Sequence, residues 1–421
     1  MIIKRIKIKN YKTYLSLDLD LSVRPDQPII LIGGMNGGGK TTLFEAICGA
    51  LYGLKIQNKA HFQELLNNGA LGKVEPTIVL ELSFEGMVLG RKQQYLLRRT
   101  YKLNPANKPV ENVLLNMDGT PFSYGTATPP QQRAINEQQV NKIIKANLPQ
   151  ELSKYFLFDA MQSSELLKEN VFAQIIKDNI QNVMGFNKYL QLKNAAEHQQ
   201  QEWAARRLEA QKEADDRKVS IEKLERKIHQ FDVQIQQEPD VKYDMLVKLK
   251  PFFEDVADTL LKRKKEKIEE DMKEQLNKLL ISYKGCIAKV ELSDSMENFT
   301  IRLYHKAGNE ISLNQLNAAS KQIFIQVLLK VLRNLGDYNP PVMIDTVMGV
   351  LDEESRDVLM EEYFPGLAEQ TILLCTTSEI RKDKDYMKLE PFLSRSYTLV
   401  RDVASQSTHV EEGYFGVMCN E

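Results

Sequence analysis

The sequence has few cysteines and no long hydrophobic run, and each shortage excludes a class of protein. Its four cysteines lie far apart, and no Cys-x-x-Cys pair occurs, so neither a zinc knuckle nor a redox motif is visible. The apolar stretches are much shorter than the roughly 18 residues of a membrane-spanning helix. The first residues alternate like a strand and lack the features of a signal peptide. We therefore expect a protein of the reducing cytoplasm with no membrane partner.

Positive and negative residues are nearly equal in number, so the overall charge gives no indication of a nucleic-acid-binding protein. The 421 residues carry 56 Lys and Arg against 57 Asp and Glu, for a formal net charge of −1. A chain of this kind has no overall attraction to nucleic acid, although a local basic face is enough to bind DNA. Its length suggests about two or three domains.

One motif stands out against this background. Residues 34–41 read Gly-Met-Asn-Gly-Gly-Gly-Lys-Thr, a complete G-x-x-x-x-G-K-[ST] phosphate-binding loop. An apolar run of strand length, residues 28–32, precedes it, and a helical start, residues 42–47, follows it. A strand, a glycine-rich loop and a helix N-terminus together cradle the phosphates of a nucleotide with backbone N–H groups.

The motif assigns a role to most of its residues. We expect Lys40 to reach the β- and γ-phosphates and the Thr41 hydroxyl to ligate Mg²⁺. The glycines let the backbone come close to the anion. The nucleotide-binding residues predicted from the loop are Gly34, Asn36, Gly37, Gly38, Gly39, Lys40, Thr41 and Thr42.

The first part of the chain reads as mixed α/β. Residues 2–8 and 15–21 alternate apolar and polar side chains, as half-buried antiparallel strands do. Further strands are predicted at residues 78–84 and 95–101, a Pro/Gly/Thr-rich loop over 119–132 and a helix over 137–147.

The middle of the chain has a different composition. Residues 187–237 are rich in Gln, Glu, Lys, Arg and Ala and contain neither Gly nor Pro. A second charged segment covers residues 259–280, and we predict two antiparallel helices joined near residues 238–240. Spacings of 3, 4, 3 and 4 residues, typical of a coiled-coil seam, separate Ile221, Leu224, Ile228, Phe231 and Ile235.

The last part of the chain is globular again and supplies a partner for the phosphate loop. A helix is expected over residues 315–335 and strands over 341–345 and 371–376. The strand at 341–345 ends in Asp345, and in P-loop enzymes such an acid holds Mg²⁺. We therefore predict two halves of one nucleotide-binding head, residues 1–180 and 285–421, separated by a coiled-coil arm, residues 181–284.

At this point the chain resembles a family. Residues 345–352, D-T-V-M-G-V-L-D, are similar to the D-E-P-x-x-x-L-D of ABC-type ATPase heads. A split head with an inserted antiparallel coiled coil is the layout of SMC proteins and SMC-like DNA-repair ATPases. Residues 6–14, I-K-I-K-N-Y-K-T-Y, resemble the opening of those heads, which implies that Lys12 lies near the phosphates. The coil is short for this class, and the residues leave open whether it is naturally short or truncated.

Within the superfamily the chain most resembles DndD, the ATPase of bacterial DNA phosphorothioation systems. Residues 156–159, F-L-F-D, are similar to its F-F-F-D-G-E segment, which implies that Asp159 occupies the Q-loop position near the metal. Residues 344–352, 376–380 and 412–415 also resemble DndD segments, in the same order. The resemblance covers both head halves but not the coil.

The resemblance implies a fold and a set of partners. The fold is α/β, an ABC-type P-loop ATPase head assembled from the N- and C-terminal halves, with ATP and Mg²⁺ as its ligands. Two heads would form a homodimer with ATP sandwiched between them. Asn317, in the signature-like stretch of residues 316–322, and Asp352 would then contact nucleotide. DNA and other subunits of a DNA modification or defence system are the further expected partners.

Several positions depart from the family pattern. Thr346 stands where most ABC ATPases have the glutamate that polarises the attacking water, and Thr377 stands in place of the switch histidine. A hydroxyl is a poor general base at neutral pH. With Asp345, these two threonines are the predicted catalytic residues, and Glu353, Glu354 or Glu379 are alternatives as the base. The signature-like stretch lacks the usual serine and glycine, so we expect slow hydrolysis.

Three functions fit these observations. The first is an SMC-like ATPase that acts on DNA, and the second is a nucleotide-gated scaffold with little hydrolysis. The third is the SMC-like subunit of an anti-phage defence complex whose partner carries a nuclease. Lys4, Lys7 and Lys9 in the first strand are a candidate DNA contact, although such a pattern is more typical of a solvated strand face.

Overall fold

The computed structural model describes most of both ends of the chain and part of its middle. The described residues are 1–88, 91–150, 153, 156–159, 195, 197–199, 201–202, 241–293, 300–313, 316–334, 340–346, 348 and 351–419. The chain divides into two compact units, one of Met1–Asn179 with Glu269–Glu421 and one of Ile180–Ile268. The predicted coiled-coil seam at residues 221–235 lies outside the described residues.

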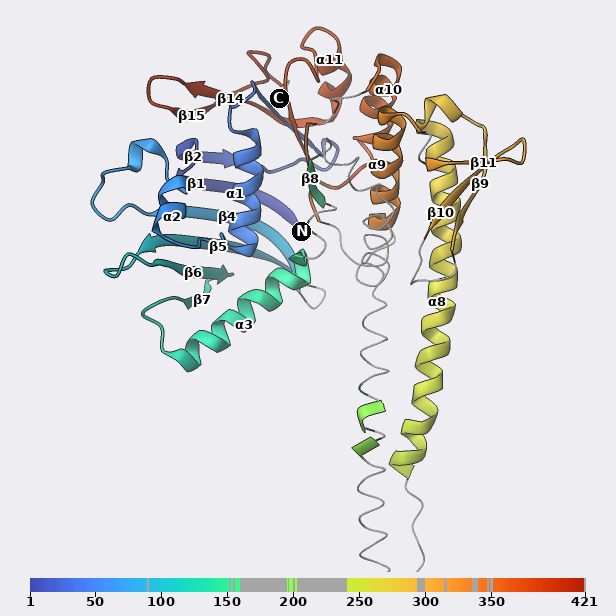
Figure 1. Cartoon of the computed structure of the whole chain (residues 1–421), viewed down its shortest axis with the longest axis horizontal. Helices are drawn as coiled ribbons and strands as arrows, with labels where there is room; N and C mark the ends of the chain where they lie inside the picture. Colours follow the sequence, from blue (N-terminus) through green and yellow to red (C-terminus); the bar gives the residue numbers. More distant parts are fainter. Residues whose placement is uncertain are drawn as a thin grey trace, which may run out of the picture. The chain divides into compact units, whose positions relative to one another are not determined.

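The first unit contains an antiparallel sheet with the strand order β2-β1-β4-β5-β6-β7 (Figure 1). Alternation dictates its two faces along β1, since Ile6 and Ile8 are fully or almost fully buried while Arg5, Lys7 and Lys9 are exposed. The strands of this sheet are β1 (Ile2–Tyr11), β2 (Tyr14–Asp20), β4 (Ile78–Val88), β5 (Arg91–Leu103), β6 (Pro109–Met117) and β7 (Thr120–Tyr124).

A second sheet forms the core of this unit, with the order β15-β14-β3-β13-β12-β8. All neighbours pair in parallel except β14 and β15, and the strands β3, β12 and β13 are buried along their whole length, as parallel strands covered on both faces are. The strands are β3 (Ile29–Gly34), β8 (Leu157–Asp159), β12 (Val342–Asp345), β13 (Thr371–Cys375), β14 (Leu393–Asp402) and β15 (Ser407–Glu412). Strands from both ends of the chain therefore complete one sheet.

The helix α1 (Lys40–Tyr52) contacts strands of both sheets, namely β1, β4 and β5 of the first and β3 and β12 of the second. Leu43, Ala46 and Ile47 are buried in these contacts. The Arg99 guanidinium, on β5, donates hydrogen bonds to the carbonyls of Ala50 and Leu51 at distances of 2.8 and 2.9 Å. These bonds satisfy carbonyls of the last turn, which have no partner inside a helix. The C-terminus of α1 is thus fixed to the first sheet.

A three-stranded sheet with the order β11-β10-β9 belongs to the C-terminal part of the first unit. Its strands are β9 (Ile287–Leu292), β10 (Ile301–His305) and β11 (Glu310–Ile311). The helix α8 (Val241–Leu279) leads into this region, where Met272, Leu276 and Leu279 are buried. The remaining α-helices are α2 (Lys59–Leu65), α3 (Pro130–Asn147), α9 (Ala318–Asn334), α10 (Glu353–Val358) and α11 (Asp385–Leu389). Short helical turns are η1 (Asn68–Ala70), η3 (Ile281–Tyr283), η5 (Leu359–Tyr363) and η6 (Glu390–Phe392).

The structure corrects three local expectations. Residues 120–124 of the predicted loop form β7, because Asp118 and Gly119, with φ of 46° and 90°, make a two-residue turn that returns the chain onto β6. The helix predicted over 137–147 begins at Pro130 instead, whereas α8 begins at Val241, next to the expected junction at 238–240. The exposed basic side chains of β1 belong to Arg5, Lys7 and Lys9, because alternate residues of a strand share a face, whereas Lys4 is half-buried at a register shift in the pairing with β4.

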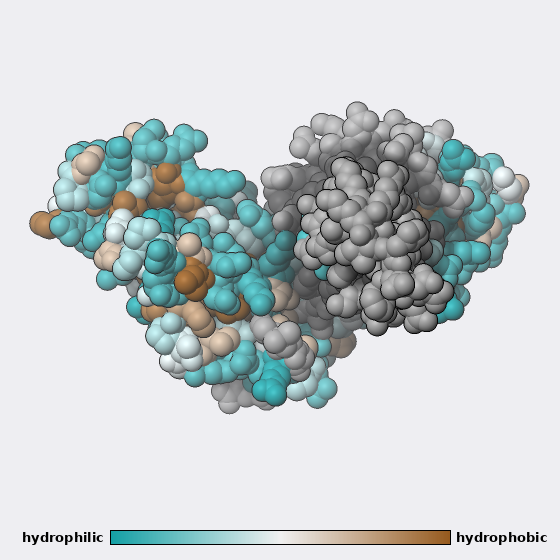
Figure 2. Space-filling model, turned by 90° about the horizontal axis from the view of Figure 1, so that it is seen from below, coloured by the Kyte–Doolittle hydropathy of each residue, from teal (hydrophilic) through white to brown (hydrophobic). Residues whose placement is uncertain are grey.

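Much of this basic strand face is neutralised by neighbouring acids. Arg5 and Lys7 pair with Asp18 on β2, and Lys7 also pairs with Glu81 on β4. The arrangement favours the solvated strand face over the DNA contact, because paired cations attract phosphates less. On the side of the molecule drawn in Figure 2, the coloured surface is largely hydrophilic with small hydrophobic patches. No helix in the described part of the chain is long and apolar enough to cross a membrane.

Candidate nucleotide-binding site

The loop of residues 34–41 lies between β3 and α1, as predicted, and its backbone needs glycine. Gly37 and Gly39 have φ of 76° and 104°, a region that other residues occupy only at a cost. A Cβ on Gly39 would lie 2.9 Å from both the Thr13 Oγ1 and the Tyr14 hydroxyl oxygen. The Tyr14 hydroxyl donates a 2.9 Å hydrogen bond to the Gly39 carbonyl, and burial raises its pKa, so it stays a donor.

Helix α1 begins at Lys40, within the last two residues of this loop, so its first N–H groups point toward the space that the loop surrounds. The Lys40 side chain is only 8% exposed. Its ammonium donates to the carbonyls of Gly34 and Met35 at 2.7 and 3.2 Å. The side chain therefore folds back over its own loop, and its charge is held where an anion bound by the loop would lie.

The structure brings Thr41 and Asp345 together although 304 residues separate them. The Thr41 hydroxyl donates a 2.9 Å hydrogen bond to Oδ2 of Asp345, which lies at the end of β12 and is 4% exposed. Hydroxyl and carboxylate oxygens are ligands that Mg²⁺ prefers. No cluster of three or more His, Cys, Asp or Glu side chains suited to a metal occurs among the described residues. This sparse donor set fits Mg²⁺, which usually keeps waters and binds substrate phosphates beside one or two protein ligands.

Asp159 lies on β8, the strand beside β12. The parallel register pairs Asp159 with Asp345, so the backbones of the two acids lie next to each other at the same end of the sheet. The side chain of Asp159 lies outside the described residues. Its role as a metal ligand stays a prediction.

Lys12 has a partner that the sequence did not indicate. Its ammonium forms an ion pair with Glu45 in the second turn of α1, and it also lies 5.8 Å from the centre of the Tyr11 ring. Of the other predicted loop residues, Asn36 is exposed and Thr42 is buried. The predicted contact of Lys12 with phosphates would require its ammonium to leave Glu45 or to bind both groups.

Two loops follow β12 and β13 at the same end of the sheet as Asp345. Thr346 has a φ of 58°, which is unusual for a β-branched residue, and its N–H donates to the Leu374 carbonyl at 3.2 Å. Thr377 is partly exposed in the loop after β13. Burial raises the pKa of the neighbouring Cys375 thiol to about 12, so Cys375 remains a neutral thiol there.

Glu379 joins these two loops. It is 6% exposed, and its Oε1 accepts a 3.2 Å hydrogen bond from the N–H of Met348. Its Oε2 accepts bonds from the N–H and the hydroxyl of Thr376 at 2.9 and 3.0 Å. Both carboxylate oxygens are thus used as acceptors, which does not favour Glu379 as a base for water. Glu353, another alternative, forms ion pairs with Arg381 and Lys384.

Arg356, on α10, links the same loops. Its guanidinium donates to the carbonyls of Leu351 and Ser378 at 3.0 Å, and to those of Met348 and Glu379 at 3.3 Å. No sequence motif indicated this residue, because its partners are backbone carbonyls that only the fold brings together.

The predicted dimer contacts, Asn317 and Asp352, both lie at helix N-termini. Asn317 Oδ1 accepts a 2.7 Å bond from the Ser320 N–H at the start of α9, and Asp352 Oδ1 accepts a 2.8 Å bond from the Ser355 N–H at the start of α10. Each side-chain oxygen caps its own helix. Asn317 is exposed, and the cap uses only its side-chain oxygen. Its amide NH₂ group therefore remains able to donate hydrogen bonds to another molecule.

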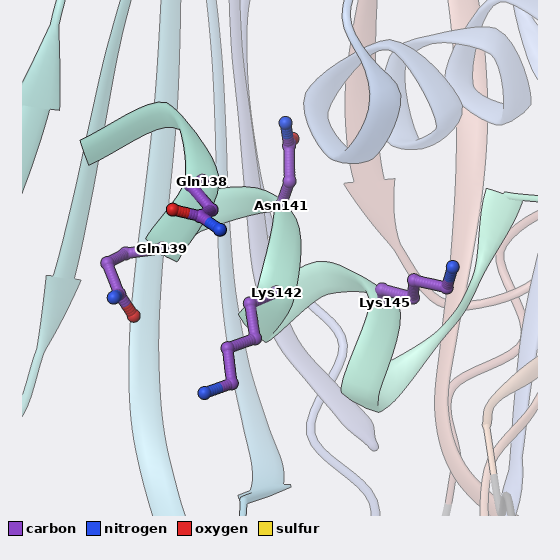
Figure 3. A pocket seen from close by; sticks show the side chains of 5 residues that line it. All are labelled: Gln138, Gln139, Asn141, Lys142 and Lys145. Atoms are coloured by element: carbon purple, nitrogen blue, oxygen red, sulfur yellow. The ribbon is translucent and has the colours of Figure 1, made fainter. Parts of the chain in front are cut away.

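A separate open depression lies on α3. Gln138, Gln139, Asn141, Lys142 and Lys145 line it, and Figure 3 shows that all five side chains extend from this one helix. It contains amides and two cations but no acid or hydroxyl. It therefore offers no converging set of groups comparable with the loop of residues 34–41.

Comparison with known proteins agrees with this geometry. A family model described as an AAA domain matches residues 5–323, which is more than half of the chain. No curated protein matches this chain.

Solved structures match over nearly the whole chain. The Smc head domain of Pyrococcus furiosus, with an extended coiled coil and bound to the C-terminal domain of ScpA, has a TM-score of 0.64 at 14% identity over 98% of this chain and 96% of that one. The Smc head domain of Pyrococcus yayanosii, with a coiled coil and joint, has a TM-score of 0.64 at 13% identity over 98% and 97%. At such identities the likeness is one of fold, and it confirms the fold class predicted from the sequence.

Proposed function

The chain belongs to the AAA domain family and has the fold of Smc ATPase heads, and from this premise we propose that it binds ATP with Mg²⁺ and hydrolyses it slowly. The contact of 2.9 Å between Thr41 Oγ1 and Asp345 Oδ2 carries the proposal. It joins the phosphate loop of the N-terminal half to the acid of the C-terminal half. Neither half alone contains both groups.

The chain's own residues have distinct tasks in this site. The N–H groups at the start of α1 bind phosphate oxygens, and Lys40 exchanges the carbonyls of Gly34 and Met35 for the β- and γ-phosphates. Thr41 and Asp345 would hold Mg²⁺, with Asp159 near them. When bound, Mg²⁺ neutralises charge that develops on phosphate oxygens.

Slow hydrolysis follows from the groups around the attacking water. Thr346 is no general base at neutral pH, and Glu379 uses both oxygens to hold the loops. The loss of general-base assistance lowers rates by typically 10²–10⁴-fold. If Thr346 occupies the water-activating position, Thr346→Glu should raise turnover above that of wild type.

ATP would also join two heads. We propose a homodimer in which Asn317 and Asp352 of one copy face the nucleotide of the other. Light scattering with a non-hydrolysable ATP analogue tests this, and a persistent monomer at tens of micromolar would count against it. The P. furiosus Smc head was solved bound to part of ScpA, which supports a further protein subunit as a partner.

The cellular role that we propose is in a bacterial DNA modification system of the phosphorothioation type or in DNA defence. The support is the resemblance to DndD in residues 156–159, 344–352, 376–380 and 412–415. DNA would then engage the head or the coil. An anti-phage complex with a nuclease partner is the alternative, and the identity of the neighbouring genes separates the two.

The decisive experiment measures ATP binding by calorimetry for wild type, Lys40→Ala and Asp345→Asn. Loss of the Lys40 charge should remove roughly 1.5–3 kcal/mol of binding free energy. Affinity within about twofold of wild type in Lys40→Ala would refute this site.

Steady-state turnover, with and without DNA, then separates a slow ATPase from a nucleotide-gated scaffold. The scaffold is favoured by the occupied carboxylate of Glu379. Turnover of several per second in isolated wild type would exclude both the scaffold and the slow ATPase.

A further inference from the structure

The strand β14 runs beside the phosphate loop on the side opposite to the metal residues. It pairs in parallel with β3, and the register ends with Leu399 beside Gly34. Leu399 is buried, and a Cβ on Gly34 would lie 3.3 Å from the Leu399 Cβ. Two residues further along β14, Arg401 is on the same side of the strand as Leu399. The phosphate loop is therefore in contact with a strand more than 350 residues away in the sequence.

Arg401 brings a charge to this loop. Its Nη1 donates a 3.3 Å hydrogen bond to the Gly37 carbonyl, while the rest of the side chain is exposed. The neighbouring acid, Asp402, accepts bonds from Ala404 and Ser405 within the β14–β15 turn instead. In the part of the chain that the structure describes, no carboxylate forms an ion pair with Arg401.

The order of strands decides which end of a nucleotide would meet this guanidinium. In the core sheet, β13 and β12 lie on one side of β3 and β14 lies on the other. Asp345, at the end of β12, contacts Thr41 and marks the metal and γ-phosphate end of the site. A triphosphate chain that runs across the loop from this end leads toward β14. Its nucleoside end thus comes to the side of Arg401.

We propose that Arg401 binds the nucleoside part of ATP, with its guanidinium stacked on the adenine ring. An Arg guanidinium is planar and keeps its charge, and it packs favourably on an aromatic face. The hydrogen bond to Gly37 holds one edge of the guanidinium and leaves its face available. The inference rests on the proposed function, because it requires a nucleotide in the loop of residues 34–41.

The test compares ATP with a probe that lacks the nucleoside. Calorimetry with Mg²⁺ measures the Kd of ATP and of inorganic tripolyphosphate for wild type, Arg401→Ala, Arg401→Lys and Lys40→Ala. Loss of a cation–π contact predicts an ATP Kd about 3- to 30-fold higher in Arg401→Ala, with the tripolyphosphate Kd within twofold of wild type. Arg401→Lys should show a smaller loss for ATP. Lys40→Ala should weaken both ligands.

Arg395→Ala is the matched control, because Arg395 lies on the same strand but pairs with Asp20. It should leave both Kd values unchanged. If Arg401→Ala weakens ATP and tripolyphosphate equally, the residue contacts phosphate and the stacking is refuted. If it changes neither, Arg401 has no part in binding. If wild type binds ATP but Arg401→Ala is normal, only this inference fails, whereas a wild type that binds no ATP overturns the proposed function as well.

Discussion

Two regions at the candidate site acquire their shapes in different ways. The phosphate loop, residues 34–41, depends on its own glycines, with φ of 76° and 104° at Gly37 and Gly39. The clamped loops, which we define as residues 346, 348, 351–352 and 376–379, depend on side chains, because Glu379 and Arg356 connect them through hydrogen bonds. A local conformation can be recognised in a sequence, whereas a clamp between distant segments exists only in the fold.

The comparison also separates binding from catalysis. The phosphate loop holds the groups that we propose to bind phosphate, and these match the standard motif. The clamped loops hold Thr346 and Thr377, where the sequence departs from its family. A buried carboxylate that accepts several hydrogen bonds is a rigid support, since removal of one partner leaves buried donors unsatisfied. We therefore expect changes in the two regions to separate ATP affinity from stability and turnover.

The largest effect should come from Gly39→Ala. The new Cβ would contact Thr13 and Tyr14 at 2.9 Å, and its φ of 104° is unfavourable for alanine. We expect ATP affinity to fall by about 100-fold or more, which is about 2.7 kcal/mol. Gly72→Ala is the matched control, because Gly72 has a φ of 85° but nothing within 4 Å of a Cβ. Equal ATP affinity in the two variants would show that the loop needs no glycine at position 39.

The next effect is expected from Glu379→Ala. It removes the acceptor of the Met348 and Thr376 bonds, and we expect the free energy of unfolding to fall by about 2–3 kcal/mol in urea denaturation. Glu379→Gln keeps an acceptor and should lose less. At temperatures where both variants are folded, ATP affinity should stay near that of wild type while turnover falls. A variant that loses ATP affinity instead would place Glu379 in the binding site.

A third test addresses α9, which carries the signature-like stretch but lies outside both regions. Burial, with the charges of Arg333 and Lys278, lowers the pKa of Lys330 from 10.5 to about 8. Between these pH values the unfolded chain binds more protons, so wild-type stability rises with pH. Lys330→Met should therefore raise the free energy of unfolding by about 1 kcal/mol at pH 7. This figure already includes the cost of losing the contact between Lys330 and the Tyr363 ring.

This gain should be complete below pH 8 and disappear as the pH approaches 10.5. Thermal unfolding at several pH values measures it, with Lys142→Met on the exposed face of α3 as the control. A gain that is independent of pH would mean that packing, and not the buried charge, causes it.

The smallest effect should come from Thr346→Gly. Glycine accepts the φ of 58° without the steric cost paid by a β-branched residue, but it loses more entropy on folding. We expect a net stabilisation of about 0.5 kcal/mol. Glu75→Gly, at an exposed position with a φ of 48°, is the control and should gain less. If Thr346→Gly is destabilising, the threonine side chain makes contacts that outweigh the backbone strain.

Local patterns made much of the fold predictable. The alternation in residues 2–8 and 15–21 and the apolar runs at 28–32 and 341–345 correspond to β1, β2, β3 and β12. The missed strands include β6, β7, β9, β10, β11 and β14, because strand formation in these segments depends on pairing with neighbours. The predicted boundaries of the domains and the roles of the site residues stay predictions.

The sequence by itself determined the phosphate loop, since the positive φ angles at Gly37 and Gly39 and the close contacts at Gly39 favour glycine and are encoded within eight residues. It also placed an acid at the end of the β12 strand. Only the tertiary structure decided that Asp345 meets Thr41, that Glu379 and Arg356 clamp two loops, and that Arg401 lies on Gly37. These contacts depend on the order of strands in one parallel sheet, and that order is set by the burial of both chain halves together.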